Sequence, residues 1–202
     1  MSRLIERAIQ SWAEELLGFS PVLVVEGARQ TGKSTLARML RPNAITVTLD
    51  DPQTLDYARN DPVGFAAQAG DGVLIIDEFQ RLPSLSLAIK ANVDADRRPG
   101  RFILTGSSDF ARVRGDKDSL AGRALSVTVC PLTQAEVRDT TASGTLVDRL
   151  LGATGVHDLP ASAEPLTHTG LAHLLTAGGF PAVHNAKPRL RAEWYRNYVE
   201  RL

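Results

Sequence analysis

The sequence predicts an α/β fold, in which short buried strands alternate with helices around a mostly parallel sheet. Two stretches indicate it. A glycine-containing loop at residues 27–35 lies between an apolar run and a helix-forming segment, and a second apolar run at residues 72–76 ends in two acids. The chain has 202 residues, of which 43% are hydrophobic, so it can form one moderate domain and a smaller second piece. We therefore expect three layers around a five-stranded sheet, followed by a small helical C-terminal segment.

The loop from Gly27 to Thr35 carries the clearest chemical signal. Its residues, GARQTGKST, fit the phosphate-loop pattern G-x-x-x-x-G-K-[ST] at every fixed position. Glycine lets backbone N–H groups curl around phosphates, Lys33 adds a charge at the β and γ phosphates, and Ser34 offers a hydroxyl to Mg²⁺. A chance match in an ordinary turn is the alternative, but a strand at 21–26 and a helix at 34–40 occur in the required order. The expected ATP-binding residues are Gly27, Ala28, Arg29, Gln30, Thr31, Gly32, Lys33, Ser34 and Thr35.

The second informative stretch is the apolar run that ends in Asp77 and Glu78. Because the carboxyl ends of parallel strands meet at one edge of a sheet, both acids should lie near the phosphate loop. Asp77 is then expected to hold Mg²⁺ together with Ser34, and Glu78 to deprotonate the water that attacks the γ-phosphate. A strand that is simply ended by charged residues is the alternative. A kinase would not need the second acid.

Other acids have ordinary structural explanations. A strand-like run at 44–49 ends in Asp50 and Asp51, and Asp51 and Asp61 each precede a proline, which predicts helix N-caps. Asp50 either lies near the metal or has no special role. A helix is expected at 84–93, and residues 3–17 predict an amphipathic helix that packs on the nucleotide domain.

Two further side chains are candidates for sensing or stabilising the γ-phosphate. Ser107 follows the predicted strand at 101–105 and is the first choice for a sensor, with Thr105 the second; a serine or threonine turn is equally compatible. Arg123 precedes the predicted strand at 124–130 and could act as an arginine finger on a neighbouring subunit, although pairing with a carboxylate is favoured. The expected catalytic set is Lys33, Glu78, Ser107 and Arg123.

Composition excludes several classes of function. Lysine plus arginine and aspartate plus glutamate both number 23, so no global field attracts nucleic acid or anionic lipid. The single cysteine, Cys130, cannot form an internal disulfide and is expected to be a small core residue. The chain has neither a signal peptide nor an apolar run of the ~20 residues that span a membrane, so a cytoplasmic protein is expected.

The composition changes beyond residue 139. We expect an ATPase domain at 1–139, a linker at 140–165 and a helical segment at 166–202 that begins a second domain. Thr133 and Glu136 have the spacing of a capping box, and a helix at 166–177 should stop at GGFP. The last helix carries an apolar stripe of Leu190, Trp194, Tyr198 and Leu202, which suggests the front part of a longer protein. The four histidines lack metal-ligand spacing.

Taken in order, these motifs resemble a known family. The stretches GARQTGKST, LDDP, IIDEFQRLP, FILTGSS, LAGR, PLTQAE and GGFP are similar to those of the predicted ATP-binding proteins of bacteria and archaea, in the AAA+ branch of P-loop ATPases. The resemblance implies a P-loop NTPase sheet with the additional-strand order, residues 27–34 as Walker A, Asp77 and Glu78 as Walker B, and Ser107 near the sensor position. It also implies a further C-terminal domain.

The sequence therefore predicts an ATP-binding protein that hydrolyses Mg·ATP slowly and thereby controls an attached C-terminal region or a protein partner. One alternative is a regulatory module that binds ATP with negligible turnover. Another is a small-molecule kinase, for which Arg112 and Arg114 are the nearby candidates for a basic lid. Nucleic-acid binding by the arginine-bearing last helix is a further alternative, and the partner and oligomeric state stay open.

Overall fold

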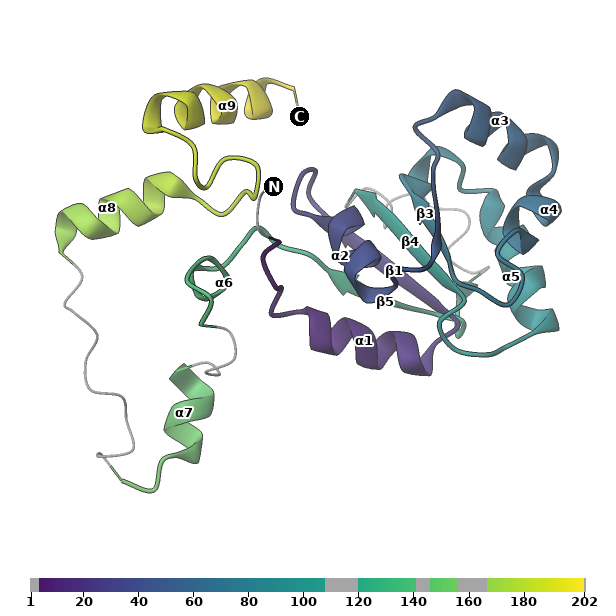
Figure 1. Cartoon of the computed structure of the whole chain (residues 1–202), viewed down its shortest axis with the longest axis horizontal. Helices are drawn as coiled ribbons and strands as arrows, with labels where there is room; N and C mark the ends of the chain where they lie inside the picture. Colours follow the sequence, from purple (N-terminus) through teal and green to yellow (C-terminus); the bar gives the residue numbers. More distant parts are fainter. Residues whose placement is uncertain (1–3, 108–119, 141–145, 156–166, 202) are drawn as a thin grey trace. The chain divides into compact units, whose positions relative to one another are not determined.

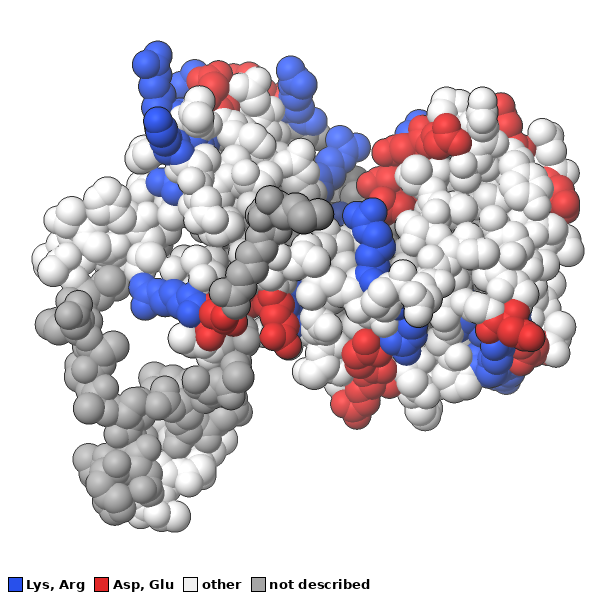
Figure 2. Space-filling view, viewed as in Figure 1, with Lys and Arg blue, Asp and Glu red and all other residues white. Residues whose placement is uncertain are grey.

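The computed structural model describes residues 4–107, 120–140, 146–155 and 167–201. Contacts divide the chain into two compact units, Ile9–Cys130 on the one hand and Met1–Ala8 with Pro131–Leu202 on the other. Charged side chains of both signs occur on each unit (Figure 2), in keeping with the balanced composition. In the described part of the chain, no helix combines the length and the apolar character needed to cross a membrane.

The larger unit is built on a five-stranded parallel sheet with the order β2-β3-β4-β1-β5. Figure 1 labels β3, β4, β1 and β5 of this sheet. Strand β4 lies between β1 and β3, which confirms the predicted fold class and the additional-strand order. The carboxyl ends of all five strands meet at one edge. The elements are α1 (Gln10–Phe19), β1 (Val22–Gly27), α2 (Lys33–Leu40), β2 (Ile45–Thr48), α3 (Pro52–Asn60), α4 (Pro62–Ala67), β3 (Leu74–Asp77), η1 (Phe79–Arg81), α5 (Leu85–Ala95), β4 (Phe102–Ser107) and β5 (Ala124–Thr128).

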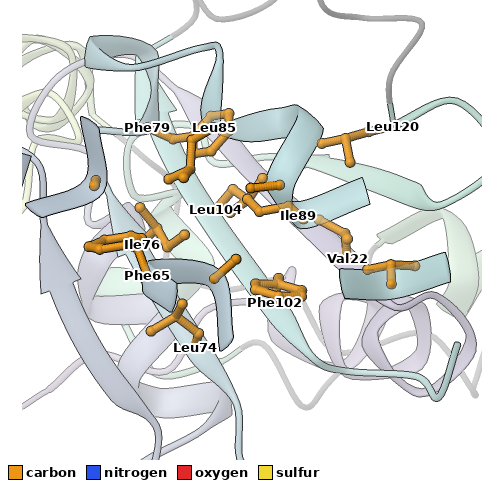
Figure 3. Close-up of a cluster of buried hydrophobic side chains, with 14 of the residues drawn as sticks. Val22, Phe65, Leu74, Ile76, Phe79, Leu85, Ile89, Phe102, Leu104 and Leu120 are labelled. Carbon is orange, nitrogen blue, oxygen red and sulfur yellow. The ribbon is translucent and has the colours of Figure 1, made fainter. Parts of the chain in front are cut away.

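Alternation along the strands produces two cores, one on each face of the sheet. Even-numbered residues of β1, β3 and β4 pack with α3, α4, α5 and η1, as Figure 3 shows for Phe65, Phe79, Leu85 and Ile89. Odd-numbered residues of the same strands pack with α1 and α2. The three central strands are thus covered on both faces, which explains why they read as continuous apolar runs. The strand residues involved are Val22, Val24, Leu74, Ile76, Phe102 and Leu104 on one face and Leu23, Val25, Ile75 and Ile103 on the other.

The predicted caps are confirmed. The Asp51 carboxylate accepts a hydrogen bond from the backbone N–H of Thr54, at 2.8 Å, and the Asp61 carboxylate accepts one from Gly64, also at 2.8 Å. Each caps a helix that has proline in its first turn.

The first helix begins later than predicted. Helix α1 starts at Gln10, and Leu4, assigned to its apolar face, is 64% exposed. The reason is a contact across the sequence: the backbone N–H of Ala8 and the guanidinium of Arg7 both donate to the Glu136 carboxylate at 2.9 Å. A backbone amide used in this way is drawn out of helical geometry. The core assignment of Cys130 is also wrong, because its side chain is exposed.

The smaller unit contains α6 (Gln134–Val137), α7 (Leu146–Gly152), α8 (His168–Ala177) and α9 (Pro188–Glu200). Thr133 and Glu136 form the predicted capping box. Helix α8 ends at Ala177 and is followed by Gly178, where φ is 63°, as the GGFP stretch predicts. Phe180 packs against Trp194 and Tyr198 of the last helix. Leu202, the last residue of the predicted stripe, lies outside the described residues, as do parts of the range expected to be a linker.

Candidate functional site

The phosphate loop joins β1 directly to α2, and its backbone needs glycine at both fixed positions. Gly27 has φ 146° and Gly32 has φ 97°, both in the region that favours glycine. A Cβ at Gly27 would lie only 2.3 Å from the carbonyl oxygen of Val129. The loop is therefore held close to the chain that follows β5, and it presents backbone rather than side chains at the N-terminus of α2, where an anion is favoured.

Lys33 starts α2 with only 6% of its surface exposed. Its Nζ donates to the carbonyl oxygen of Ala28 at 2.8 Å, so the ammonium lies over the loop. Burial lowers the pKa of Lys33, and Arg29 lowers it further, whereas the negative charges of Glu78 and Asp77 partly offset the shift. The ammonium thus lies within electrostatic reach of both acids.

Asp77, at the end of β3, receives hydrogen bonds from two neighbouring elements. The Ser34 hydroxyl of α2 donates to Oδ1 and Oδ2 at 2.8 and 2.9 Å, and the Thr105 hydroxyl of β4 also donates to Oδ1. Ile76 pairs with Leu104 in the sheet, which brings the next residue of each strand side by side. Thr105 is 1% exposed, so this contact is shielded from water.

Ser107, the first choice for a sensor, lies at the end of β4, where it pairs in register with Gly27 of the phosphate loop. It shares the sheet edge with Asp77 and is partly buried. In the described part of the chain, the hydroxyl that β4 contributes to Asp77 is that of Thr105, the second choice.

Glu78 follows Asp77 in an unusual backbone conformation. Its φ of 57° is left-handed, which is uncommon for a residue other than glycine, and it directly precedes the short helix η1. The side-chain amide of Gln80 donates to Glu78 Oε2. Gln80 was not among the residues predicted from the sequence, although its position two residues after Glu78 was a usable signal.

Two predicted residues have other partners. Arg123 precedes β5, and its carbonyl accepts from Val22 at the start of β1, so it lies at the amino edge of the sheet, opposite the phosphate loop. Its guanidinium forms two hydrogen bonds with Asp94, at 2.6 and 2.9 Å, and the hydrogen bond from Arg123 lowers the pKa of Asp94. Asp50 pairs with Arg81 and is largely exposed. Within its own chain, Arg123 is not brought to the Walker residues.

The donor set at the carboxyl edge fits magnesium. Mg²⁺ prefers hard oxygen ligands, and in nucleotide sites it uses one or two protein oxygens together with phosphate oxygens and water. The Ser34 hydroxyl and the Asp77 carboxylate, which are in contact, supply such oxygens. The described residues contain no group of three His, Cys, Asp or Glu side chains that could hold a metal alone.

These features define a P-loop NTPase. A family model described as an AAA domain matches residues 19–138, more than half of the chain, so the chain belongs to this family of AAA-type P-loop NTPases. The resemblance seen in the motifs is thereby confirmed. Membership in the family suggests ATP binding and hydrolysis, generally with Mg²⁺.

Two curated relatives and two solved structures are similar to the chain. Uncharacterized protein Rv2008c of Mycobacterium tuberculosis and Uncharacterized protein Mb2031c of Mycobacterium bovis are each 34% identical over 123 residues, which are 61% of this chain but only 28% of each relative. The P-loop NTPase domain of the sigma-54 transport activator from E. coli is 20% identical, with a TM-score of 0.45, over 64% of this chain and 100% of that one. The Walker-type ATPase of Pyrococcus abyssi is 19% identical, with a TM-score of 0.46, over 70% and 58%.

Proposed function

We propose that this chain binds Mg·ATP and hydrolyses it slowly, and that the cycle switches an attached C-terminal region or a partner protein. The observation that carries the proposal is the placement of Asp77, which receives the Ser34 hydroxyl from the start of α2 at 2.8 Å, with Glu78 as its direct neighbour. The site thus combines oxygen ligands for a metal with a second carboxylate. Hydrolysis uses such a second carboxylate, and simple phosphate binding does not.

Each group has a distinct task in the proposed reaction. The loop amides and the Lys33 ammonium hold the β and γ phosphates, and Mg²⁺, when bound by Ser34 and Asp77, neutralises phosphate charge. Glu78 accepts a proton from water as the water oxygen bonds to the γ-phosphorus. The bond from phosphorus to the ADP oxygen breaks, and inorganic phosphate and ADP leave. Ser107 and Thr105 lie at the same edge and are proposed to respond to the γ-phosphate.

The domain boundaries and the control of a C-terminal region are part of the same proposal. We propose an ATPase domain at 1–139, followed by a linker and a helical segment. The family match ends at residue 138, which supports the end of that domain, although the compact unit itself comprises Ile9–Cys130. The relatives extend well beyond the matched 28% of their length, and we take that additional chain as the kind of region that the nucleotide cycle would control.

The test compares two single variants with the wild type. In Lys33→Ala we expect loss of nucleotide binding, because the buried ammonium is removed from the loop. In Glu78→Gln we expect ATP binding to persist, while turnover falls by about 10²- to 10⁴-fold, the usual contribution of a general base. Fluorescent-nucleotide titration measures the binding, and phosphate release measures the turnover. Equal phosphate release by wild type and Glu78→Gln would rule out the base role.

The alternatives differ in their products. A kinase transfers phosphate to an acceptor, so labelled ATP would yield a labelled small molecule rather than free phosphate; Arg112 and Arg114, its lid candidates, lie outside the described residues. A regulatory module would bind ATP and release no phosphate in a single-turnover experiment. A role of Arg123 in a neighbouring subunit would make turnover rise steeply with protein concentration, and Arg123→Ala would abolish that rise. The pairing with Asp94 instead supports a structural role.

A further inference from the structure

The turn that follows the acid pair contains an amide held against the proposed base. Gln80 lies in η1, and its Nε2 donates to Glu78 Oε2, with both side chains partly buried. We propose that Gln80 is a positioning residue, which holds the Glu78 carboxylate in the orientation that takes the proton from the attacking water. This inference rests on the proposed function, because it requires Glu78 to act as the base.

The backbone of the turn is fixed, but the Glu78 side chain is not fixed by the backbone alone. Phe79 is 1% exposed in the core between the sheet and α5, and the N–H of Arg81 donates to the Glu78 carbonyl at 3.0 Å. These contacts hold the left-handed conformation of Glu78 in place. A glutamate side chain still has three rotatable bonds and gains considerable entropy when unrestrained. A hydrogen bond near its end is therefore needed to select one orientation.

In the described part of the chain, Gln80 supplies that hydrogen bond. The hydroxyls of Ser34 and Thr105 donate to Asp77, and the Lys33 ammonium donates to the Ala28 carbonyl. The contact from Gln80 engages Oε2 of Glu78. We therefore assign the other oxygen, Oε1, as the atom that accepts the proton from the attacking water.

Glutamine is a poor choice at this position for stability alone. Its side-chain oxygen is buried and lacks a hydrogen-bond partner among the residues described. Buried polar atoms without partners are unfavourable, and an apolar side chain of the same length would avoid that cost. The amide N–H, directed at Glu78, is the group that distinguishes glutamine from such a side chain. A hydrogen bond to a charged group also contributes stability, so the experiments below measure turnover separately from folding.

The first experiment uses Gln80→Met, which keeps the length of the side chain and removes the donor. We expect kcat for ATP to fall about tenfold to a hundredfold, while the KM and the nucleotide dissociation constant stay at their wild-type values. Gln68→Met is the matched control, because Gln68 is also partly buried and donates its amide to the Phe65 carbonyl, away from the loop. Wild-type or faster turnover in Gln80→Met overturns the inference.

A double-mutant cycle separates positioning from a general structural effect. In a Glu78→Gln background, Gln80→Met should cause no further loss, because both changes remove the same oriented base. A full additional loss in the double variant overturns the inference. If Glu78→Gln itself turns over at the wild-type rate, the proposed function fails instead, so the two failures are distinguishable.

The variant Gln80→Glu gives a readout that separates the donor from the bulk of the side chain. It keeps the length of glutamine, but a carboxylate offers no donor and repels Glu78. We expect kcat to fall at least as far as in Gln80→Met, with the nucleotide dissociation constant unchanged. Wild-type kcat in Gln80→Glu contradicts the proposal.

Discussion

Replacing Thr105 by valine removes the hydroxyl that donates to Asp77 and nearly preserves the shape of the side chain. A hydrogen bond to a charged group stabilises the fold by about 1.5–3 kcal/mol, whereas burial of the methyl group that replaces the hydroxyl stabilises it by about 0.8 kcal/mol. Because Thr105 is 1% exposed, water cannot replace the lost donor. We expect the free energy of unfolding to fall by roughly 1–2 kcal/mol, measured by urea denaturation.

The same substitution should weaken the use of magnesium. Asp77 would keep only the Ser34 hydroxyl as its hydroxyl donor among the described residues, so its carboxylate becomes less well oriented. With about 1.4 kcal/mol for each factor of ten, the Mg²⁺ concentration for half-maximal ATP turnover should rise about tenfold. Thr46→Val, on the exposed part of β2, is the matched control and should leave both quantities unchanged.

Comparison with Ser107→Ala tests which hydroxyl of β4 supports Asp77. Ser107→Ala should retain the wild-type stability and Mg²⁺ requirement, because the β4 hydroxyl that contacts Asp77 belongs to Thr105. The reasoning would be refuted if Thr105→Val kept the wild-type stability and Mg²⁺ requirement while Ser107→Ala lowered the stability and raised the Mg²⁺ requirement.

Gly27→Ala should abolish ATP binding and lower the free energy of unfolding by roughly 2–4 kcal/mol, because the methyl group meets the Val129 carbonyl at 2.3 Å and φ is 146°. Gly70→Ala, with φ 52° and open space around the new Cβ, separates backbone strain from this clash and should cost only about 1 kcal/mol. Burial opposes ionisation of Glu136, but hydrogen bonds from Thr133, Ala8 and Arg7 outweigh it and lower the pKa of Glu136. The charged form therefore stabilises the fold fully above the pKa of the unfolded state, about 4.3. The free energy of unfolding of Glu136→Gln should therefore be about 1–3 kcal/mol below that of wild type at pH 7. The difference should disappear as the pH falls through the lowered pKa that Glu136 has in the folded state. A difference that stays constant down to low pH would contradict this prediction.

Local sequence signals were sufficient for most of the larger unit. The three central strands are short apolar runs that are buried on both faces, so their composition alone marks them. Asp51 and Asp61 are followed by proline and cap their helices through neighbours three residues away. These features depend on residues close in sequence, which is why they could be predicted.

Long-range contacts account for the errors. The start of α1 depends on Glu136, 128 residues from Ala8, and no helical periodicity contains that information. Cys130 follows β5 at a point where the chain leaves the sheet and the side chain is exposed. Residue type favoured burial of this cysteine, but its place in the tertiary structure decided otherwise.

The sequence predicted which residues lie at the carboxyl edge of the sheet, but not all of the contacts between their side chains. Asp77 and Ser34 could be placed together because parallel strands end at one edge. The choice between Thr105 and Ser107 depended on the register of β3 against β4. Because a helix separates these two strands in the chain, the local sequence does not define their register. Gln80 was missed because its contact depends on a left-handed backbone at Glu78, a conformation that a residue other than glycine seldom adopts.

That conformation also explains how two adjacent acids could perform different tasks. Asp77 ends a strand, and its carboxylate is held by hydroxyls from α2 and β4, which suits a fixed ligand. Glu78 leaves the extended conformation at φ 57°, and its carboxylate contacts an amide within its own turn. A carboxylate held only within a short turn can be reoriented without disturbing the sheet, whereas one bonded to two packed elements cannot. If the nucleotide cycle is coupled to a C-terminal region or a partner, as we propose, a signal that reorients the Glu78 side chain should change turnover and leave the affinity for Mg·ATP unchanged.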